Sequence, residues 1–281
     1  MTDKETIRYL KRMAVQIRAN IVRTIPPGKV GHLGGSSSIA DVLSVLYFHR
    51  LKGLSPDNMK NPDRDRLVFS KGHAVLAQYA ALCELGYFSR DELDRVKTLH
   101  SVLQGHPDID KTPGIEAVTG SLGQGLSICN GMAMALRLDN SPAKVFCICG
   151  DGELAEGQIW EAAMTSVNYK LSNLCLIIDQ NKVQATGPTE DVFPVRDLPS
   201  RFRAFGWNVL EIDGHDIEQI IAAIELADTH KAGPTCIVAD TIKGKGFPFA
   251  EGSANFHNAA LNEEQYEECL RCIEKMWKEV E

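Results

Sequence analysis

Apolar and polar residues follow two different patterns along the chain, and the patterns predict an alternation of helices and strands. Short continuous apolar runs bounded by turn residues are typical of strands buried on both faces of a parallel sheet. Apolar residues that recur every three or four positions indicate helices with one buried side. Strands are expected at residues 66–69, 145–149, 174–178, 207–212 and 234–241. Helices are expected at residues 4–24, 42–47, 74–86, 126–138, 157–171, 198–205, 217–230 and 263–280.

This order of elements predicts an α/β fold with an open, mostly parallel sheet and helices on both faces. We expect residues 1–281 to form a single domain, since a chain of this length with 44% hydrophobic residues can bury a large core. Residues 104–125 are rich in glycine and proline and are expected to be an irregular loop, which is often functional. The turn at residues 213–216 follows a strand and caps a helix, and its His215 is expected to be a turn residue.

Charge and composition exclude some classes of protein. The net charge is −7 and no basic run is present, which argues against nucleic acid as a partner. No apolar run reaches the roughly 18 residues that span a bilayer, and residues 1–13 lack the apolar core of a signal peptide. The eight cysteines are scattered through predicted strands and helices, where a reduced thiol behaves as a small hydrophobe. We therefore expect a cytoplasmic protein that binds neither membrane nor nucleic acid.

Residues 144–183 carry the clearest candidate for chemistry. A buried strand leads into Asp151 and Gly152, a helix follows, and a second buried strand leads into Asn181. One crossover between parallel strands would place Asp151 and Asn181 side by side at the carboxyl edge of the sheet, where ligands bind in such folds. A carboxylate and an amide carbonyl suit Mg²⁺. Gly152 and the start of the following helix would let a phosphate approach the backbone.

Histidines stand in several of the predicted loops. His32 lies in the glycine- and serine-rich residues 31–38, expected to be a loop, and His73 follows a predicted strand. His106 lies in the irregular region, and His257 ends the loop that follows the last strand. Each alone could be an ordinary loop or capping histidine. Because free imidazole titrates near physiological pH, we expect that these groups could move protons or polarise hydroxyls.

Several motifs, taken together and in order, resemble one enzyme family. Gly-Asp-Gly with a downstream Asn resembles the metal and diphosphate motif of the thiamine diphosphate enzymes, and the wider set resembles the diphosphate-binding half of transketolase. The motifs are GHLGGSSSIAD, SKGHA, GHPD, TGSLGQG, GDGELAEGQIWEA, IIDQNKVQ, DGHD and TIKGKG. The resemblance covers almost the whole chain and implies the thiamine diphosphate-binding fold. Two positions depart from the family pattern, since Leu33 replaces the usual proline and Asn258 the usual glycine.

The resemblance implies a role for each matching residue. It implies a metal site formed by Asp151, Asn181 and the backbone carbonyl of Val183. It implies contacts with the substrate and the reacting centre for His32, His73, His106 and His257. It implies contacts with the cofactor for His73, Gly120, Ser121, Leu122, Gly152, Glu153, Asn181 and His257. It also implies that Glu156 contacts its counterpart across a subunit interface.

The implied activity is transfer of a two-carbon ketol unit from a ketose phosphate to an aldose phosphate, with thiamine diphosphate and Mg²⁺ as cofactors, as in the pentose phosphate pathway. The chain is shorter than a full transketolase and is expected to lack the pyrimidine-binding half. We therefore expect the N-terminal subunit of a split enzyme, which forms an α2β2 heterotetramer with a separate C-terminal subunit. Three alternatives stay open: a specialised transketolase-like enzyme for an unusual or sulfonated sugar, the α subunit of a 2-oxo acid dehydrogenase, and a non-catalytic binding protein.

Overall fold

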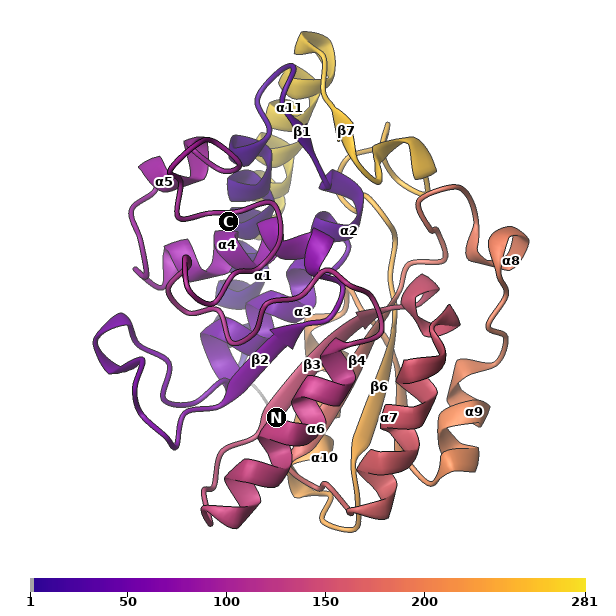
Figure 1. The fold of residues 1–281 in the computed structure, drawn as a ribbon. Helices are drawn as coiled ribbons and strands as arrows, with labels where there is room; N and C mark the ends of the chain where they lie inside the picture. Colours follow the sequence, from indigo (N-terminus) through magenta and orange to yellow (C-terminus); the bar gives the residue numbers. More distant parts are fainter. Residues whose placement is uncertain (1–2) are drawn as a thin grey trace.

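The computed structural model describes residues 3–281 and is built around a five-stranded sheet in which every strand is parallel (Figure 1). The strands are β2 (Arg66–Phe69), β3 (Val145–Gly150), β4 (Leu174–Gln180), β5 (Asn208–Asp213) and β6 (Thr235–Asp240). Their order in the sheet is β2-β3-β4-β6-β5. In the register of the sheet Gly150 pairs with Asp179, which pairs with Ala239, so the strands β3, β4 and β6 end at one edge. The predicted α/β class is confirmed.

Helices cover both faces of the sheet. One face carries α1 (Lys4–Thr24), α3 (Ala40–Val45), α4 (Val75–Glu84), α10 (Ile217–Thr229) and α11 (Glu263–Val280). The other face carries α6 (Gly125–Leu138), α7 (Gly157–Asn168) and α9 (Leu198–Phe205), of which α6 and α7 lie in front of the sheet in Figure 1. An apolar cluster lies on each face of the sheet, and successive strand residues pack into one cluster and then the other. Phe146 belongs to the cluster on the first face and Cys147 to the cluster on the second. This burial of both faces explains why the strands are continuous apolar runs in the sequence.

Most predicted elements lie within a few residues of the observed ones. Helix α6 is buried on one side, whereas Leu138 is 83% exposed and a Cβ at Gly131 would meet nothing within 4 Å. Helix α11 packs on α1 of the same chain. Its Cys269 and Ile273 are buried in the apolar cluster there.

The segment at residues 31–38 was predicted to be a loop, and this prediction is wrong. It contains the short helix α2 (Leu33–Ser37), all of whose residues are buried. Glycine and serine have low helix propensity, but tertiary packing overrides it here. A Cβ at Gly34 would lie 3.0 Å from the Phe256 carbonyl oxygen and 3.0 Å from the Lys243 side chain, so the glycine permits this close contact.

Two short helices and one pair of short strands were not predicted. The helices α5 (Asp91–Asp94) and α8 (Thr189–Val192) each have only four residues. The strand β1 (Val30–Gly31) pairs antiparallel with β7 (Ala259–Ala260) in a separate two-stranded sheet. Two-residue strands leave no periodic pattern in a sequence, yet this pairing brings the segment before α2 close to the segment that follows His257.

The structure also shows the state of the cysteines and the character of the longer helices. All eight cysteines are free, and the four that lie in strands β3, β4 and β6 are buried. Between residues 3 and 281, no helix combines the length and apolar character needed to cross a membrane.

Candidate active site

A cavity of about 160 Å³ lies where the strands β2, β3, β4 and β6 end. Most of the residues proposed from the sequence line it: His73, Leu122, Asp151, Gly152, Glu153, Asn181, Val183 and His257. The sequence did not single out the other lining residues: Gly35, Lys71, Gly150, Gln184, Ala185 and Lys243. Side chains from four strand ends thus converge on one small space, as expected for the carboxyl edge of a parallel sheet.

Asp151 is a buried carboxylate with few partners. Its Oδ1 accepts from the Gly152 N–H at 2.8 Å and its Oδ2 from the Lys182 N–H at 2.6 Å. Burial and, to a smaller extent, the nearby Asp179 charge raise the pKa of Asp151 to about 6, although the two N–H donors oppose the shift. The Lys182 contact shows that one crossover brings Asp151 to the segment that carries Asn181.

Asn181 and Val183 line the same cavity, and a lysine occupies the space beside them. The Asn181 Oδ1 accepts from the Val183 N–H at 3.2 Å. The Val183 carbonyl oxygen accepts from the Lys243 Nζ at 2.8 Å, and the same ammonium lies 2.9 Å from the His257 Nδ1. Lys243 is only 2% exposed, and burial, reinforced by the Lys71 charge, lowers its pKa to about 8. Lys243 follows a buried strand within TIKGKG. A residue at this position is a candidate for the ligand-binding edge of the sheet, and the sequence interpretation missed it.

Asp179 forms the centre of a second buried cluster, which we call the Asp179 hub: Asp179 with Lys71, Ser38, Asn181 and Thr241. Asp179 is fully buried and accepts from the Ser38 hydroxyl at 2.7 Å and the Asn181 amide at 2.9 Å. Lys71 and Thr241 also donate to it. Burial alone would raise the pKa of Asp179, but the Lys71 charge and the donors outweigh it and lower the pKa. The hub fixes the ends of β2, β4 and β6 against one another.

Glu153 is buried and its carboxylate is committed to the protein. It accepts from the Gly123 N–H at 2.9 Å and the Gly150 N–H at 3.1 Å, and also from the Ser70 hydroxyl. Any contact of Glu153 with a ligand would therefore involve its backbone. A 3₁₀ turn covers Gly152–Ala155, and α7 begins at Gly157, where the sequence predicted the helix to start.

The four histidines gather at one place. The His32 ring centroid lies 5.3 Å from that of His73, 6.2 Å from His106 and 5.5 Å from His257. Burial lowers the pKa of His32 to about 3 and that of His257 to about 4, and lysine charges add to both shifts. Burial lowers the pKa values of His73 and His106 as well. The expectation that these groups titrate near physiological pH is therefore wrong, and they are neutral imidazoles at pH 7.

Three further sequence-predicted residues, Gly120, Ser121 and Glu156, do not line this cavity. Gly120 has φ +142°, and a Cβ there would lie 2.8 Å from the His106 Cδ2, so glycine lets that ring pack on the backbone. Ser121 is exposed. Glu156 is exposed at the start of α7, and its side chain lies over Gly123, where a Cβ would meet it at 2.8 Å.

The chemistry of the cavity fits an anionic ligand joined to a divalent cation. Lys71 and Lys243 provide buried positive charge, and Asp151 is a buried carboxylate that a cation would stabilise. The Gln184 Nε2 is buried without a hydrogen-bond partner in the described part of the chain. Within residues 3–281, no three His, Cys, Asp or Glu side chains are grouped to hold a metal. The metal ligands predicted from the sequence are one carboxylate, one amide and one backbone carbonyl. Asp151 is therefore the single side chain among them that belongs to these four residue types.

The fold and the cavity define an α/β protein that can bind a phosphate-bearing ligand at the ends of parallel strands. The family model described as "Transketolase, thiamine diphosphate binding domain" matches residues 9–273. The chain therefore belongs to the transketolase family and corresponds to its thiamine diphosphate-binding domain.

Two relatives of similar length are named as subunits. The chain is 44% identical over 270 residues to the "6-deoxy-6-sulfo-D-fructose transketolase subunit SqwG" of Clostridium sp. (strain MSTE9), covering 94% of this chain and 98% of that protein. It is 42% identical over 277 residues to one of the subunits of the "Apulose-4-phosphate transketolase" of Phocaeicola vulgatus, covering 97% of this chain and 98% of that protein.

Solved transketolases have the same fold over this region. The Campylobacter jejuni transketolase superposes with a TM-score of 0.86 and 36% identity over 97% of this chain. The match covers 43% of that longer chain, so the present chain spans less than half of the solved transketolase.

Proposed function

We propose that this chain is the diphosphate-binding subunit of a two-subunit transketolase, which transfers a two-carbon ketol unit from a ketose to an aldose. The observation that carries the proposal is the cavity at the strand ends, where Asp151, Asn181 and Lys243 converge. Membership of the transketolase family supports the reaction class. It also favours this reaction over that of a 2-oxo acid dehydrogenase and over a non-catalytic role.

Different residues of the cavity would hold the metal ion and the diphosphate group of the cofactor. Asp151, Asn181 and the Val183 carbonyl would hold Mg²⁺, and Lys243 and the Gly152 backbone would face the diphosphate. The Lys243 ammonium now contacts the Val183 carbonyl, so it would leave that oxygen to the metal and turn toward the phosphates. Thiamine diphosphate, when bound, supplies the nucleophilic carbon and the electron sink for carbon–carbon bond cleavage.

The neutral histidines would recognise the sugar. A neutral imidazole offers one donor and one acceptor, which suits hydroxyl groups that both donate and accept. His32, His106 and His257 would bind and orient hydroxyls of the donor sugar, and His73 would lie closest to the diphosphate. Their lowered pKa values keep added positive charge away from the reacting centre, so a proton passed to one of them would be passed on readily.

A second chain is part of the proposal. The two relatives are named as subunits, and the present chain spans less than half of the solved transketolases. Exposed apolar side chains lie on the neighbouring helices α6 and α7: Leu138 and Met164 are 83% and 51% exposed. Such side chains suit an interface with a separate C-terminal subunit, with Glu156 at its edge, in an α2β2 assembly in the cytoplasm.

A second candidate concerns the sugar. Two relatives that match over almost their full length are named for a sulfonated ketose and for apulose 4-phosphate. We therefore propose a specialised transketolase for an unusual sugar as the alternative to a pentose phosphate enzyme. Comparing rates with sulfofructose, apulose 4-phosphate, xylulose 5-phosphate and pyruvate as donors, in the presence of the second subunit, separates these activities. Turnover of pyruvate alone would contradict both.

The test of the site is cofactor binding. Thiamine diphosphate is titrated calorimetrically into the chain with its second subunit, with and without Mg²⁺. Binding is expected only with Mg²⁺, and Asp151→Ala should weaken it at least about 100-fold because the charged metal ligand is lost. An unchanged circular dichroism spectrum controls for folding. Wild-type affinity in Asp151→Ala would rule out the metal assignment.

A further inference from the structure

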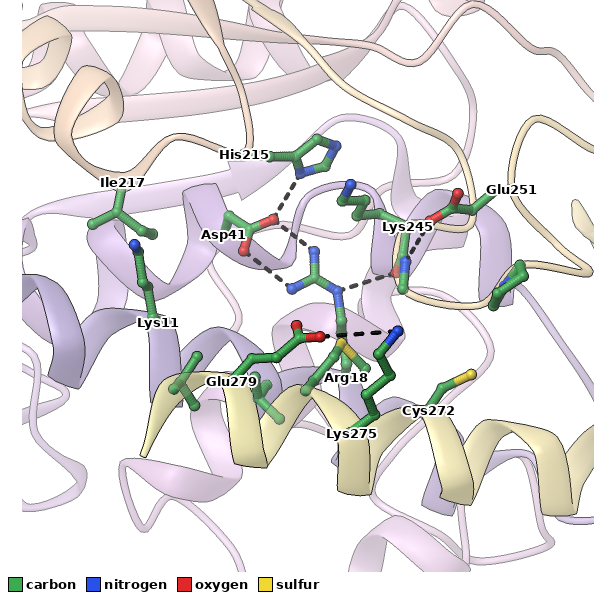
Figure 2. Close-up of a pocket in the computed structure, with 15 residues that line it drawn as sticks. Lys11, Arg18, Asp41, His215, Ile217, Lys245, Glu251, Cys272, Lys275 and Glu279 are labelled. Atoms are coloured by element: carbon green, nitrogen blue, oxygen red, sulfur yellow. Dashed lines mark hydrogen bonds and ion pairs between the residues drawn. The ribbon is translucent and has the colours of Figure 1, made fainter.

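A separate cluster of buried charged side chains lies behind the loop that carries Lys243. It borders a groove of about 450 Å³ distinct from the candidate cofactor cavity (Figure 2). We call this cluster the Asp41 clamp: Arg18 from α1, Asp41 from α3 and His215 from the turn before α10. Asp41 accepts from the Arg18 Nη1 at 3.0 Å and Nη2 at 2.6 Å, and its Oδ2 lies 2.7 Å from the His215 Nδ1. The three side chains are 5%, 12% and 13% exposed.

The contacts of His215 fix which ring nitrogen carries the proton. Burial would raise the pKa of Asp41, but Arg18 and the His215 bond outweigh burial and lower it, so Asp41 is an ionised acceptor. The His215 Nδ1 must therefore donate. On the other side of the ring, the Ile242 N–H points at the His215 Nε2 at 2.9 Å, so that nitrogen must accept. Each nitrogen has one role, and the imidazole links the clamp to the backbone of the loop.

The clamp holds the loop on both sides of Lys243. His215 accepts from the Ile242 N–H, and the Arg18 Nε donates to the Lys245 carbonyl at 3.1 Å. Between these two points the Gly244 N–H donates to the Gly34 carbonyl at 3.0 Å, with Gly244 at φ +79°. Lys243 projects away from the clamp, into the cofactor cavity, where its ammonium contacts the Val183 and Gln184 carbonyls.

We propose that His215 is a positioning residue, which fixes the backbone at Ile242 so that the Lys243 ammonium is held at the diphosphate site. The proposal rests on the proposed function for the identity of the ligand. A lysine has a long flexible stem, and fixing it in a buried place loses side-chain entropy. Supporting hydrogen bonds behind such a group reduce the freedom of the backbone that carries it. His215 itself does not line the cofactor cavity.

Two substitutions separate the two hydrogen bonds of the imidazole. Asparagine in place of His215 keeps a donor near the Nδ1 position for Asp41 but has no group that reaches the Ile242 N–H. Glutamine places an amide oxygen near the Nε2 position and keeps an acceptor for Ile242. We expect His215→Asn to weaken thiamine diphosphate affinity, with Mg²⁺ and the second subunit present, about tenfold, the usual upper range for one hydrogen bond. We expect His215→Gln to stay within about twofold of wild type. Equal losses in the two variants would overturn the proposal.

A double-mutant cycle with Lys243→Met distinguishes positioning from a general effect on folding. If His215 acts through Lys243, His215→Asn should change the affinity less than about twofold in the Lys243→Met background. The midpoint of urea unfolding should fall by the same amount in both backgrounds, because any structural role of His215 persists without the ammonium. A full tenfold loss of affinity in the Lys243→Met background would overturn the proposal.

The proposal also has a test that does not depend on the cofactor. Should the wild-type complex bind no thiamine diphosphate, the proposed function fails, and hydrogen exchange in the free chain then decides about the clamp. His215→Asn is expected to speed amide exchange in residues 241–247 about tenfold relative to both wild type and His215→Gln. Exchange that is the same in all three proteins would overturn the positioning role.

Discussion

The two carboxylates at the ends of β3 and β4 lie beside each other but have opposite surroundings. The Asp151 N–H donates to the Asp179 carbonyl at 3.2 Å, yet the two side chains belong to different clusters. Asp179 receives an ammonium and several neutral donors, and its pKa is lowered. Among the described residues, Asp151 accepts from two backbone N–H groups, and its pKa is raised to about 6.

The two buried lysines repeat this contrast. Lys71 meets the Asp179 carboxylate and Lys243 meets only carbonyl oxygens and an imidazole. In the Asp179 hub opposite charges compensate each other, so the hub serves as a framework. On the other side the buried Asp151 carboxylate and Lys243 ammonium attract each other, but neither forms a direct ion pair in the described part of the chain, and such sites are where ligands with charges of their own bind. Burial of a charge therefore marks a functional site where no ion pair balances that charge.

The largest expected effect comes from breaking the framework. Asp179→Ala leaves the Lys71 ammonium buried without its partner, and we expect the free energy of unfolding to fall by about 3–5 kcal/mol. Urea unfolding of the free chain measures this. The matched control is Asp151→Ala, which removes a carboxylate that has no ion-pair partner and should leave the free energy of unfolding at pH 7 level or raise it. Similar losses for the two variants would remove the distinction between framework and ligand site.

The next effect is a pH dependence specific to Asp151. Its pKa in the folded chain, about 6, lies above the ordinary value of 3.8, so between these pH values the folded chain holds a proton that the unfolded chain has released. Stability therefore decreases as pH rises through this range, by about 3 kcal/mol in all. Histidines with lowered pKa values act in the opposite direction, so the informative quantity is the difference between wild type and Asp151→Asn.

Urea unfolding of these two proteins at pH 4 and pH 7 measures that difference. Relative to Asp151→Asn, wild type should lose about 2 to 2.5 kcal/mol between the two pH values, since part of the unfolded-state titration lies below pH 4. All other titrating groups are shared by the two proteins and cancel. If the free energy of unfolding changed equally in the two proteins between pH 4 and pH 7, Asp151 would not lie in the unfavourable environment that its burial indicates.

Replacing each lysine with methionine sharpens the comparison further. Lys243→Met removes an uncompensated buried charge and keeps the apolar stem, so we expect the free energy of unfolding at pH 7 to stay level or rise by about 1 kcal/mol. Lys71→Met leaves the Asp179 carboxylate buried without its ion-pair partner and should lower the free energy of unfolding. Thiamine diphosphate affinity should nevertheless fall about tenfold or more in Lys243→Met, since a charge-assisted contact is lost. A stability loss as large as that of Lys71→Met would show that Lys243 belongs to the framework.

The sequence could predict the parts of this picture that depend on chain order. A parallel sheet puts strand ends at one edge, so residues that follow buried strands, such as Asp151 and Asn181, could be brought together in the prediction. The order of strands could not be deduced, because nothing local places β6 between β4 and β5. The helix at Leu33–Ser37 was missed because its residues favour a loop, and only packing against Lys243 and Phe256 explains it.

The sequence interpretation also missed the charge balance of the site. Lys71 and Lys243 stand inside quoted motifs, but lysine is almost always exposed, and only the fold shows that both are buried. Because the burial of these two lysines was not recognised, the histidines were expected to have the ordinary pKa of imidazole. Burial and these two charges shift that titration far into the acid range.

The smallest effect on the chain itself is expected outside both clusters. Glu156 is exposed at the start of α7, so Glu156→Gln should change the free energy of unfolding by less than about 0.5 kcal/mol. If Glu156 lies at an interface between subunits, the same change should weaken assembly with the second subunit, which sedimentation velocity at several concentrations can measure. Glu161→Gln, an exposed change on another side of the same helix, is the matched control. Assembly of Glu156→Gln that equals the control would place the interface elsewhere, and the exposed apolar side chains of α6 would then be the next surface to alter.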